Sequence, residues 1–521
     1  MARERVAQSS ALTMLSRMGA RSIEWRGVRL ILAVLAAVFL FVTPALAHVG
    51  SPDVFYEGNA GPYHLFVTVI IPQVIPGLAQ INIRSESKDV SQVSTSVARL
   101  TGPGSKYAPV PDLAQRSSTD PNLFTSSLWL MEYGSMRVIL KVNGDRGTAE
   151  MSVPVPSFAR RMLSMPFWLG VLLLALTIGL GIGAVSIVTA AVRDAARAPG
   201  APMTNHAKAM GRRAMAISAV VVAAICYGAF AWWNVEARDF AETAKFFKPP
   251  KLAVTLIPPN QLEVKPAPTE TEWAKYVDMK HLVPDHGHLM HLFLVRTPAL
   301  DCVWHLHPTQ MNDGPFIDNL PSIAAGHYEA FADIVDKSGF PWTLVGSVDL
   351  PNVNGAPLSG DDSGGTAIPL GETHESTIAT LSHGARVIWQ RDAAPLKANV
   401  PTILRFEIQE ASGKPSSDLQ PYMGMAAHAA IIKSDMSVFA HIHPSGTVPM
   451  AALMLADNES SDSSMAGMNM SPGMKMSMPE ERISAEISIP YGFPAPGPYR
   501  IFLQFNLGGQ IQTVAFDTQV E

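Results

Sequence analysis

Cysteine is scarce in this sequence, and both a strong charge of one sign and the common catalytic motifs are missing. Two cysteines among 521 residues exclude a disulfide framework, and we expect Cys226 and Cys302 to be free thiols. A formal net charge of −5 gives no electrostatic basis for nucleic-acid binding. The G-x-S-x-G, P-loop, dinucleotide and H-E-x-x-H patterns do not occur, so the sequence does not indicate a hydrolase, a nucleotide enzyme or a zincin.

Charge is also missing from two long apolar stretches, residues 166–192 and 214–234. Their length and composition predict two transmembrane helices, and the lack of any acidic, basic or histidine side chain favours an anchor over an ion path. The intervening loop, residues 193–213, has a single acidic residue, Asp194. Its basic residues are Arg193, Arg197, Lys208, Arg212 and Arg213. The positive-inside rule therefore predicts that this loop is cytoplasmic and that the large domains lie outside an inner membrane, in the periplasm or extracellular space.

The N-terminus has the pattern of a signal peptide over residues 1–47, with a basic region, an apolar core and Ala45-Leu46-Ala47 as the cleavage site. Cleavage there would make His48 the first residue. Its α-amine and imidazole would together chelate copper(II), with His64 as a further ligand. The alternatives are that His48 is incidental, or that the signal is retained as an anchor.

The exported parts alternate β-prone runs with turns rich in glycine and proline, which predicts a mainly β protein with immunoglobulin-like β-sandwich domains. We place the domains at residues 48–158, 251–350 and 384–521, and take residues 351–383 as a linker. The last two domains are predicted to be a tandem repeat.

The repeat is clearest in two predicted β-hairpins. His291 to Arg296 is followed by a turn and Val303 to Pro308, and His428 to Lys433 by a turn and Val438 to Pro444. The numbers of facing residues in an antiparallel pair have a constant sum. If Arg296 faces Cys302, then His291 lies opposite His307. If Lys433 faces Val438, then His428 lies opposite His443. Each hairpin then has its histidines on one face.

Alternation along the strands adds His305 to the first pair and His441 to the second, so three imidazoles are predicted on each hairpin. Such a set suits copper, with zinc possible, since neutral imidazole is a ligand that both accept. The alternative is that these are core or interface histidines kept by a duplication. A regular strand points Cys302 to the other face, away from the histidines. His286 and His288 either extend the first site or belong to a solvated loop.

A methionine-rich insert interrupts the last domain at residues 457–481. Its methionines are Met465, Met468, Met470, Met474, Met476 and Met478. Few apolar partners accompany them, so a helical core stripe is not indicated. Thioether sulfur selects copper(I), and we expect these residues to gather that ion in preference to forming a featureless loop.

These segments resemble known copper-handling modules. The exported sandwich with a mature N-terminal His is similar to the CopC and YtkA/FixH-like group of periplasmic β-sandwich modules. The segment from Pro421 to Gly446 resembles a recurring part of secreted bacterial proteins from copper-handling neighbourhoods, and the insert resembles those of copper and silver resistance proteins. The resemblance implies a copper(II) role for His48, with His64 and Asp53 as candidate partners.

From the sequence we expect a membrane-anchored exported protein for copper storage, delivery or resistance, with a copper-transfer protein as partner and no catalytic residues. Two other classes stay open. One is a metal-free adhesion or scaffold protein of immunoglobulin-like modules. The other is a copper-dependent oxidoreductase, in which a three-histidine site keeps an open position.

Overall fold

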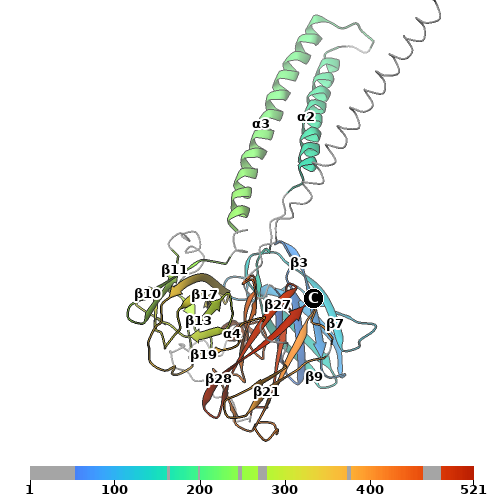
Figure 1. Cartoon of the computed structure of the whole chain (residues 1–521). Helices are drawn as coiled ribbons and strands as arrows, with labels where there is room; N and C mark the ends of the chain where they lie inside the picture. Colours follow the sequence, from blue (N-terminus) through green and yellow to red (C-terminus); the bar gives the residue numbers. More distant parts are fainter. Residues whose placement is uncertain are drawn as a thin grey trace, which may run out of the picture. The chain divides into compact units, whose positions relative to one another are not determined.

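The computed structural model describes residues 53–160, 165–197, 200–243, 249–267, 279–371, 377–392, 394–460 and 483–521 (Figure 1). The predicted signal peptide, His48 and the six methionines of the insert lie outside these residues. The described part is mainly β, with antiparallel strand pairing and two long apolar helices, as the sequence predicts.

The first sandwich comprises residues 53–160, and its two sheets share one apolar core. One sheet has the order β1 (Val54–Ala60), β2 (Tyr63–Ile70), β3 (Gly77–Ser85), β7 (Leu123–Leu130) and β6 (Gln115–Arg116). The other has the order β5 (Asp112–Leu113), β4 (Val90–Arg99), β8 (Gly134–Gly144) and β9 (Gly147–Ser157). Buried and exposed residues alternate along β3, as period-two patterning requires for a half-buried strand.

The second sandwich begins at residue 249 and again pairs two sheets around one core. The smaller sheet has the order β10 (Leu252–Ile257), β11 (Gln261–Pro266), β16 (Phe316–Asn319) and β15 (Thr309–Gln310). The larger has the order β12 (Leu282–Val283), β17 (Gly326–Asp336), β13 (His291–Thr297), β14 (Cys302–Leu306) and β19 (Ser363–Thr366), with β18 (Pro341–Leu350) also paired to β17.

The third sandwich begins at residue 377 and has the same two-sheet build. One sheet has the order β20 (Ile378–Thr380), β21 (Arg386–Gln390), β22 (Thr402–Gln409) and β26 (Glu486–Tyr491). The other has the order β23 (Leu419–Gln420), β27 (Gly497–Leu507), β24 (His428–Lys433) and β25 (Phe439–Ile442), with β28 (Gln510–Val520) also paired to β27. Helix α4 (Met450–Ser460) follows β25.

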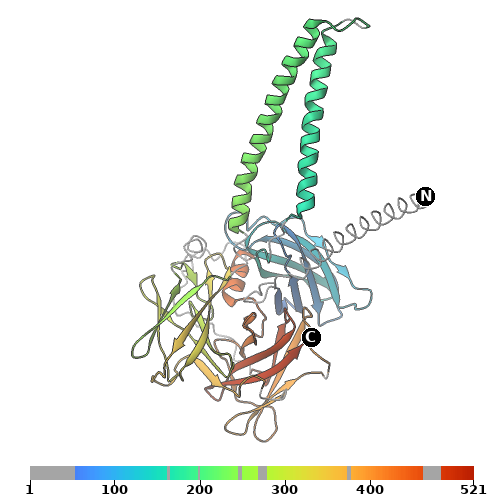
Figure 2. The same ribbon diagram turned by 45° about the horizontal axis from the view of Figure 1, so that its top comes forward.

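Helices α2 (Phe167–Ala195) and α3 (Asn205–Thr243) pack side by side (Figures 1 and 2). The two candidate spans, Phe167–Ala195 and Asn205–Arg238, are long and apolar enough to cross a membrane. The structure extends both helices into the predicted loop 193–213, because the basic residues there are compatible with helix and no proline interrupts it before residue 199.

The second and third sandwiches pack through the faces of their larger sheets that do not point into their own cores. Phe293 and Phe331 of the second sandwich meet Phe439 and Phe502 of the third in a separate apolar cluster. The rings of Phe331 and Phe439 stack with centroids 4.2 Å apart. The histidine-bearing hairpins β13–β14 and β24–β25 belong to these two facing sheets, so the packing brings the predicted sites together.

The first sandwich interlocks with the third. Phe55 of β1 is 5% exposed and belongs to the core of the third sandwich, while Ala452 and Ala456 of α4 belong to the core of the first. Two backbone hydrogen bonds, from Glu57 N to Ser445 O at 3.0 Å and from Thr447 N to Phe55 O at 2.9 Å, hold β1 against the segment after His443. Helix α4, at the start of the predicted insert, is therefore a packing element between sandwiches.

The predicted linker 351–383 is structured in part, which corrects that interpretation. Its residues 363–366 form strand β19, which pairs with β14 of the second sandwich. A Cβ on Gly364 would lie 2.4 Å from the Trp304 ring, and one on Gly365 would lie 2.8 Å from Thr513. The glycines that suggested a linker are there because the strand passes between two close neighbours.

Candidate metal centre

Both hairpins have the predicted register. Leu292 pairs with Leu306 in the first and Ala429 with Ile442 in the second, which places His291 opposite His307 and His428 opposite His443. Cys302 points to the opposite face, as predicted, and is 3% exposed in the core of the second sandwich. Burial raises the pKa of its thiol, so it is not activated for chemistry.

Because the two hairpin faces meet, their histidines form one cluster with two more from the 285–288 turn. The cluster comprises His286, His288, His291, His305, His307, His428, His441 and His443. Rings from different sandwiches lie close, with centroids 4.7 Å apart for His286 and His443 and 5.2 Å apart for His291 and His441. Of the two options left open for His286 and His288, the structure places both in the cluster.

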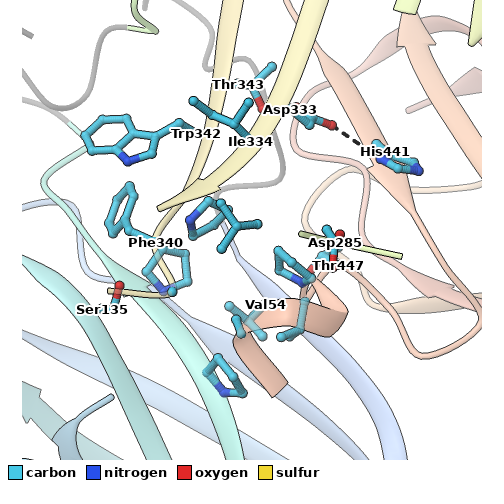
Figure 3. A pocket seen from close by; sticks show the side chains of 18 of the residues that line it. Val54, Ser135, Asp285, Asp333, Ile334, Phe340, Trp342, Thr343, His441 and Thr447 are labelled. Atoms are coloured by element: carbon cyan, nitrogen blue, oxygen red, sulfur yellow. Dashed lines mark hydrogen bonds and ion pairs between the residues drawn. The ribbon is translucent and has the colours of Figure 1, made fainter. Parts of the chain in front are cut away.

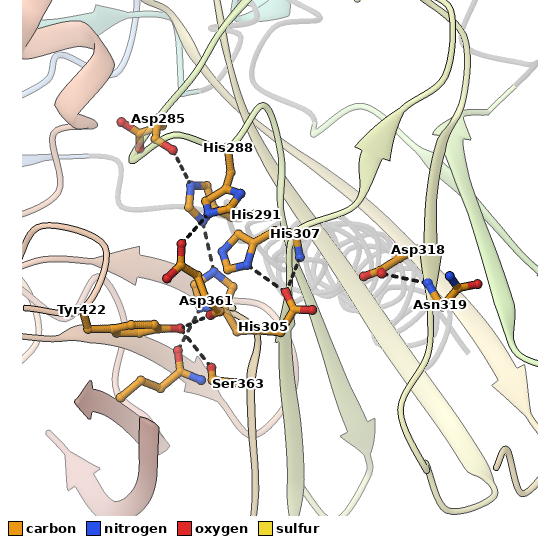
Figure 4. A network of polar contacts seen from close by, with 12 residues as sticks. Asp285, His288, His291, His305, His307, Asp318, Asn319, Asp361, Ser363 and Tyr422 are labelled. Carbon is orange, nitrogen blue, oxygen red and sulfur yellow. Dashed lines mark hydrogen bonds and ion pairs between the residues drawn. The ribbon is translucent and has the colours of Figure 1, made fainter. Parts of the chain in front are cut away.

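The first trio consists of His291, His305 and His307, whose candidate ligand atoms all lie within 4.8 Å of one another. Each ring is anchored through its outer nitrogen (Figure 4). His291 Nε2 donates to the Asp285 carbonyl at 3.1 Å, His305 Nδ1 to Gln504 Oε1 at 2.9 Å and His307 Nδ1 to Asp362 Oδ1 at 2.9 Å. Oxygen acceptors on the outer nitrogens are the usual arrangement around metal-binding histidines.

This anchoring leaves the inner nitrogens of the first trio without protons. A neutral imidazole has one N–H, so His291 Nδ1 and His305 Nε2, 3.1 Å apart, face each other with lone pairs. That separation is close to the edge of a tetrahedron around an ion with bonds of about 2.0 Å, which is about 3.3 Å. His307 Nε2 is buried and has no hydrogen-bond partner in the part of the chain that the structure describes. A cation between these atoms would satisfy all three.

The second trio differs from the prediction in one member. The atoms that lie within 4.8 Å of one another belong to His286, His428 and His443. The third member is therefore His286 of the second sandwich, and not His441 as predicted. His286 Nδ1 donates to the Met423 carbonyl at 2.8 Å and leaves its Nε2 unpartnered. Both ring nitrogens of His428 and of His443 are also buried without partners among the described residues. Buried polar atoms seldom lack partners, so each of these marks a place for a ligand.

His441 lies between the two trios. Its ring centroid is 5.3 Å from that of His305 and 4.6 Å from that of His443. Its Nδ1 faces the Asp333 carboxylate at 3.4 Å, and its Nε2 is buried and unpartnered among the described residues. This histidine is positioned to serve either trio.

Burial keeps the hairpin histidines neutral. It lowers the pKa of His307 and depresses further the pKa values of five others, which are His291, His305, His428, His441 and His443. Neighbouring imidazoles add to this effect for most of them, because one charged ring would repel the next. Neutral imidazole is the form that binds a metal.

The same shifts predict acid sensitivity of the metal-free protein. A histidine whose pKa is lower in the folded than in the unfolded state stabilises the fold above its ordinary pKa of about 6.5, and this is lost as pH falls. Asp333 and Asp318, whose pKa values burial raises to about 7 and about 6, act in the opposite sense but are two groups against six. We expect a lower denaturant midpoint at pH 5.5 than at pH 7.5 in excess chelator. An equal midpoint would contradict neutral burial.

Several residues of the centre were not recognised in the sequence. Asp361 and Asp362 hold His288 and His307 through side-chain hydrogen bonds of 2.9 Å each, and Tyr422 donates to the Asp361 carbonyl at 2.8 Å. The two aspartates come from the predicted linker and Gln504 from a strand with no motif.

The proposed partners of His48 are far apart. In the β1–β2 hairpin His64 pairs with Asn59 near the turn, whereas Asp53 precedes Val54, which pairs with Val69 at the other end. Six residue steps separate Asp53 from Asn59, roughly 20 Å at about 3.3 Å each. His64 instead contacts Asn59 Oδ1 and Glu57 Oε1, at 2.8 and 3.0 Å. His48 itself lies outside the described residues.

A cavity of about 150 Å³ reaches the cluster (Figure 3). His291, His441 and His443 line one part of it together with Asp333 and Asp285. The rest of the lining is largely apolar and comes from all three sandwiches. Its polar end combines imidazole nitrogens and carboxylates, so an ion or a small molecule could reach the histidines by this route.

Comparisons with known proteins add little about function. Residues 379–521, which include His428, His441 and His443, match a domain of unknown function (DUF8832). No curated protein matches the chain. Among solved structures the chain is similar to dimeric latent PorU from Porphyromonas gingivalis, at 11% identity and TM-score 0.14, covering 90% of this chain and 34% of that one.

Two further structures match at the same level. One is a D1–D4 ectodomain fragment of ICAM-5, at 7% identity and TM-score 0.15, covering 90% of this chain and 77% of that one. The other is an alpha-2-macroglobulin of E. coli, at 8% identity and TM-score 0.16, covering 90% and 25%. TM-scores this low carry no argument about function.

Proposed function

We propose that this protein is a membrane-anchored, exported copper-binding protein that stores, delivers or detoxifies copper. The observation that carries the proposal is the buried cluster of imidazoles, in which five rings have nitrogens without hydrogen-bond partners among the described residues. Leaving each such atom unsatisfied costs about 1–3 kcal/mol, which a bound ion would recover. Neutral imidazoles bind copper(II), copper(I) and zinc.

Copper is favoured over zinc by the methionine-rich insert, since thioether sulfur selects copper(I). The predicted insert begins within α4, and the first turn of this helix is hydrogen-bonded to a residue next to the cluster. Asp285 Oδ1 accepts a hydrogen bond from Ala451 N at 2.7 Å, and the neighbouring His286 is a candidate ligand. In this proposal the insert exchanges copper(I) with the histidines or with a partner protein.

The proposal places the sandwiches outside the membrane. The excess of basic residues in the predicted loop 193–213, which includes the adjoining ends of α2 and α3, supports a cytoplasmic loop, and the predicted signal peptide supports exported sandwiches. Protease added to intact spheroplasts should then cleave the sandwiches and spare an epitope placed between the helices. Protection of the sandwiches would contradict this orientation.

Copper retention by the full-length protein in detergent tests the function. The protein is stripped with chelator, loaded with copper(I) or copper(II), desalted and assayed for bound metal. We expect retention to fall sharply when the hairpin histidines His291, His305, His307, His428, His441 and His443 are replaced by glutamine. The matched control replaces the exposed His327 and His383 and should retain copper as wild type does. Equal retention in the six-fold variant would remove the cluster as the copper site.

A copper-dependent oxidoreductase is the second candidate, and the cavity at His441 and His443 is the observation that favours it. A route for a small molecule to the candidate ligands serves catalysis as well as ion entry. Oxygen consumption by copper-loaded protein with ascorbate, above that of the six-fold variant, would support this function. Equal consumption would argue for binding alone.

A further inference from the structure

The second trio is assembled from two sandwiches. His286 belongs to the second sandwich, whereas His428 and His443 belong to the third. His428 and His443 are 0% and 3% exposed, and neither ring nitrogen of either residue has a partner among the described residues. The His286 ring is 5.0 Å from that of His428 and 4.7 Å from that of His443, measured between centroids.

The backbone at His286 is left-handed and forms a tight turn. His286 has φ +51° and is followed by Gly287 at φ +90°, in a tight turn closed by hydrogen bonds of 2.8 and 2.9 Å between Asp285 and His288. Glycine adopts this left-handed conformation freely, and asparagine and histidine are among the few other residues enriched in it.

A similar turn lies opposite, in the third sandwich. Tyr422 and Met425 close it with reciprocal hydrogen bonds of 2.8 and 3.1 Å, and Met423 and Gly424 have φ +49° and +79°. The Met423 carbonyl accepts the hydrogen bond from His286 Nδ1. The ring is thereby fixed across the domain boundary, with its unpartnered Nε2 toward His428 and His443.

The number of imidazoles exceeds what one ion uses. Copper and zinc in protein sites take about four ligands, whereas eight rings gather here. Their nitrogens converge at two places, one in each trio. Between the trios the rings are farther apart, with centroids 6.3 Å apart for His305 and His428 and 6.2 Å apart for His286 and His291.

We propose that the cluster is a two-ion copper centre and that its second ion, held by His286, His428 and His443, joins the second and third sandwiches. This inference rests on the proposed copper-binding function. An ion that takes ligands from both sandwiches binds only their docked arrangement, and it therefore stabilises that arrangement by linkage. Occupancy of the second site then stabilises the interface between the two facing sheets.

Bound copper in trio variants of the full-length protein tests the number of ions. His286→Asn removes one ligand of the second trio and suits the left-handed backbone, so the fold should be kept. His307→Asn removes one ligand of the first trio, and His327→Asn is the matched exposed control. Copper(II) is used under oxidising conditions, where the methionine insert does not compete, and each thermal midpoint is first measured in chelator.

We expect each single trio variant to lose at least one copper equivalent relative to wild type, and the double variant to lose two. Electron paramagnetic resonance should show coupled copper(II) spins in wild type and an isolated signal in each single variant that keeps one ion. Loss of only one equivalent in the double variant would overturn the two-ion centre and leave the copper function standing. No loss in any variant would overturn the copper function itself.

Hydrogen exchange tests whether the second ion joins the two sandwiches, independently of the number of ions bound. Copper should slow amide exchange in residues 422–425 of the third sandwich in wild type and in His307→Asn. The same residues should gain no protection in His286→Asn, although the substitution is in the other sandwich. Protection that persists in His286→Asn would overturn the shared site.

Discussion

Replacing His428 with leucine is expected to make the metal-free protein more stable by about 1–3 kcal/mol, and to remove copper from the second trio. His428 is 0% exposed with both ring nitrogens unpartnered among the described residues, so the apo protein carries the cost of an unsatisfied polar group. Leucine has a similar volume and no polar atoms. The denaturant midpoint in chelator and the copper retained after desalting are the two measurements.

His305→Leu is the matched control, and the opposite stability change is expected. His305 is equally buried, but its Nδ1 donates to Gln504 Oε1 at 2.9 Å, so leucine would leave that amide oxygen without its partner. A destabilised His428→Leu would show that His428 is an ordinary structural histidine. That result, with copper retention unchanged, would favour the metal-free scaffold.

Replacing Asp517 with alanine is expected to destabilise the protein by about 3–5 kcal/mol, because it leaves a buried cation unpaired. Arg500 is 2% exposed and forms two hydrogen bonds to the Asp517 carboxylate, at 2.6 and 2.7 Å. Its third contact, at 2.7 Å, is to the carbonyl of Leu300 in the second sandwich. The loss of stability is measured as a fall in the denaturant midpoint. The substitution should also weaken the contact between the two sandwiches.

Two controls make this prediction specific. Arg500→Met with Asp517→Leu removes both charges, and most of the stability should return because apolar side chains of similar size replace a buried ion pair at little cost. Glu486→Ala breaks the Arg405–Glu486 pair in the same sandwich, where both side chains are about half exposed, and should cost about 0–1 kcal/mol. Equal losses for Asp517→Ala and Glu486→Ala would show that burial does not set the cost.

The hairpins were predictable because their determinants are local. Strand alternation and short turns are enough to set the register, and the constant sum of paired residue numbers holds for His291 with His307 and for His428 with His443. The orientation of the Cys302 side chain, away from the histidines, follows from the same alternation. The two apolar helices were equally accessible, since length and composition decide whether a helix can span a bilayer.

The composition of the centre was not predictable, because it depends on contacts between segments far apart in the sequence. His286 joins His428 and His443 only because two sheets pack face to face through Phe293, Phe331 and their partners. The carboxylates at 361 and 362 reach the histidines because β19 pairs with β14, in a stretch whose glycine content indicated a linker. Composition alone does not distinguish flexible glycine from glycine required by close packing.

By itself the sequence determined the mainly β fold, the helical pair and the presence of histidines on one face of each hairpin, since these depend on periodicities of a few residues. Only the tertiary structure decided that the two faces meet, that His286 takes the place expected for His441, and which nitrogens are left without partners. The physical reason is that ring convergence and burial are set by sheet packing, where apolar contacts from distant segments position each polar atom.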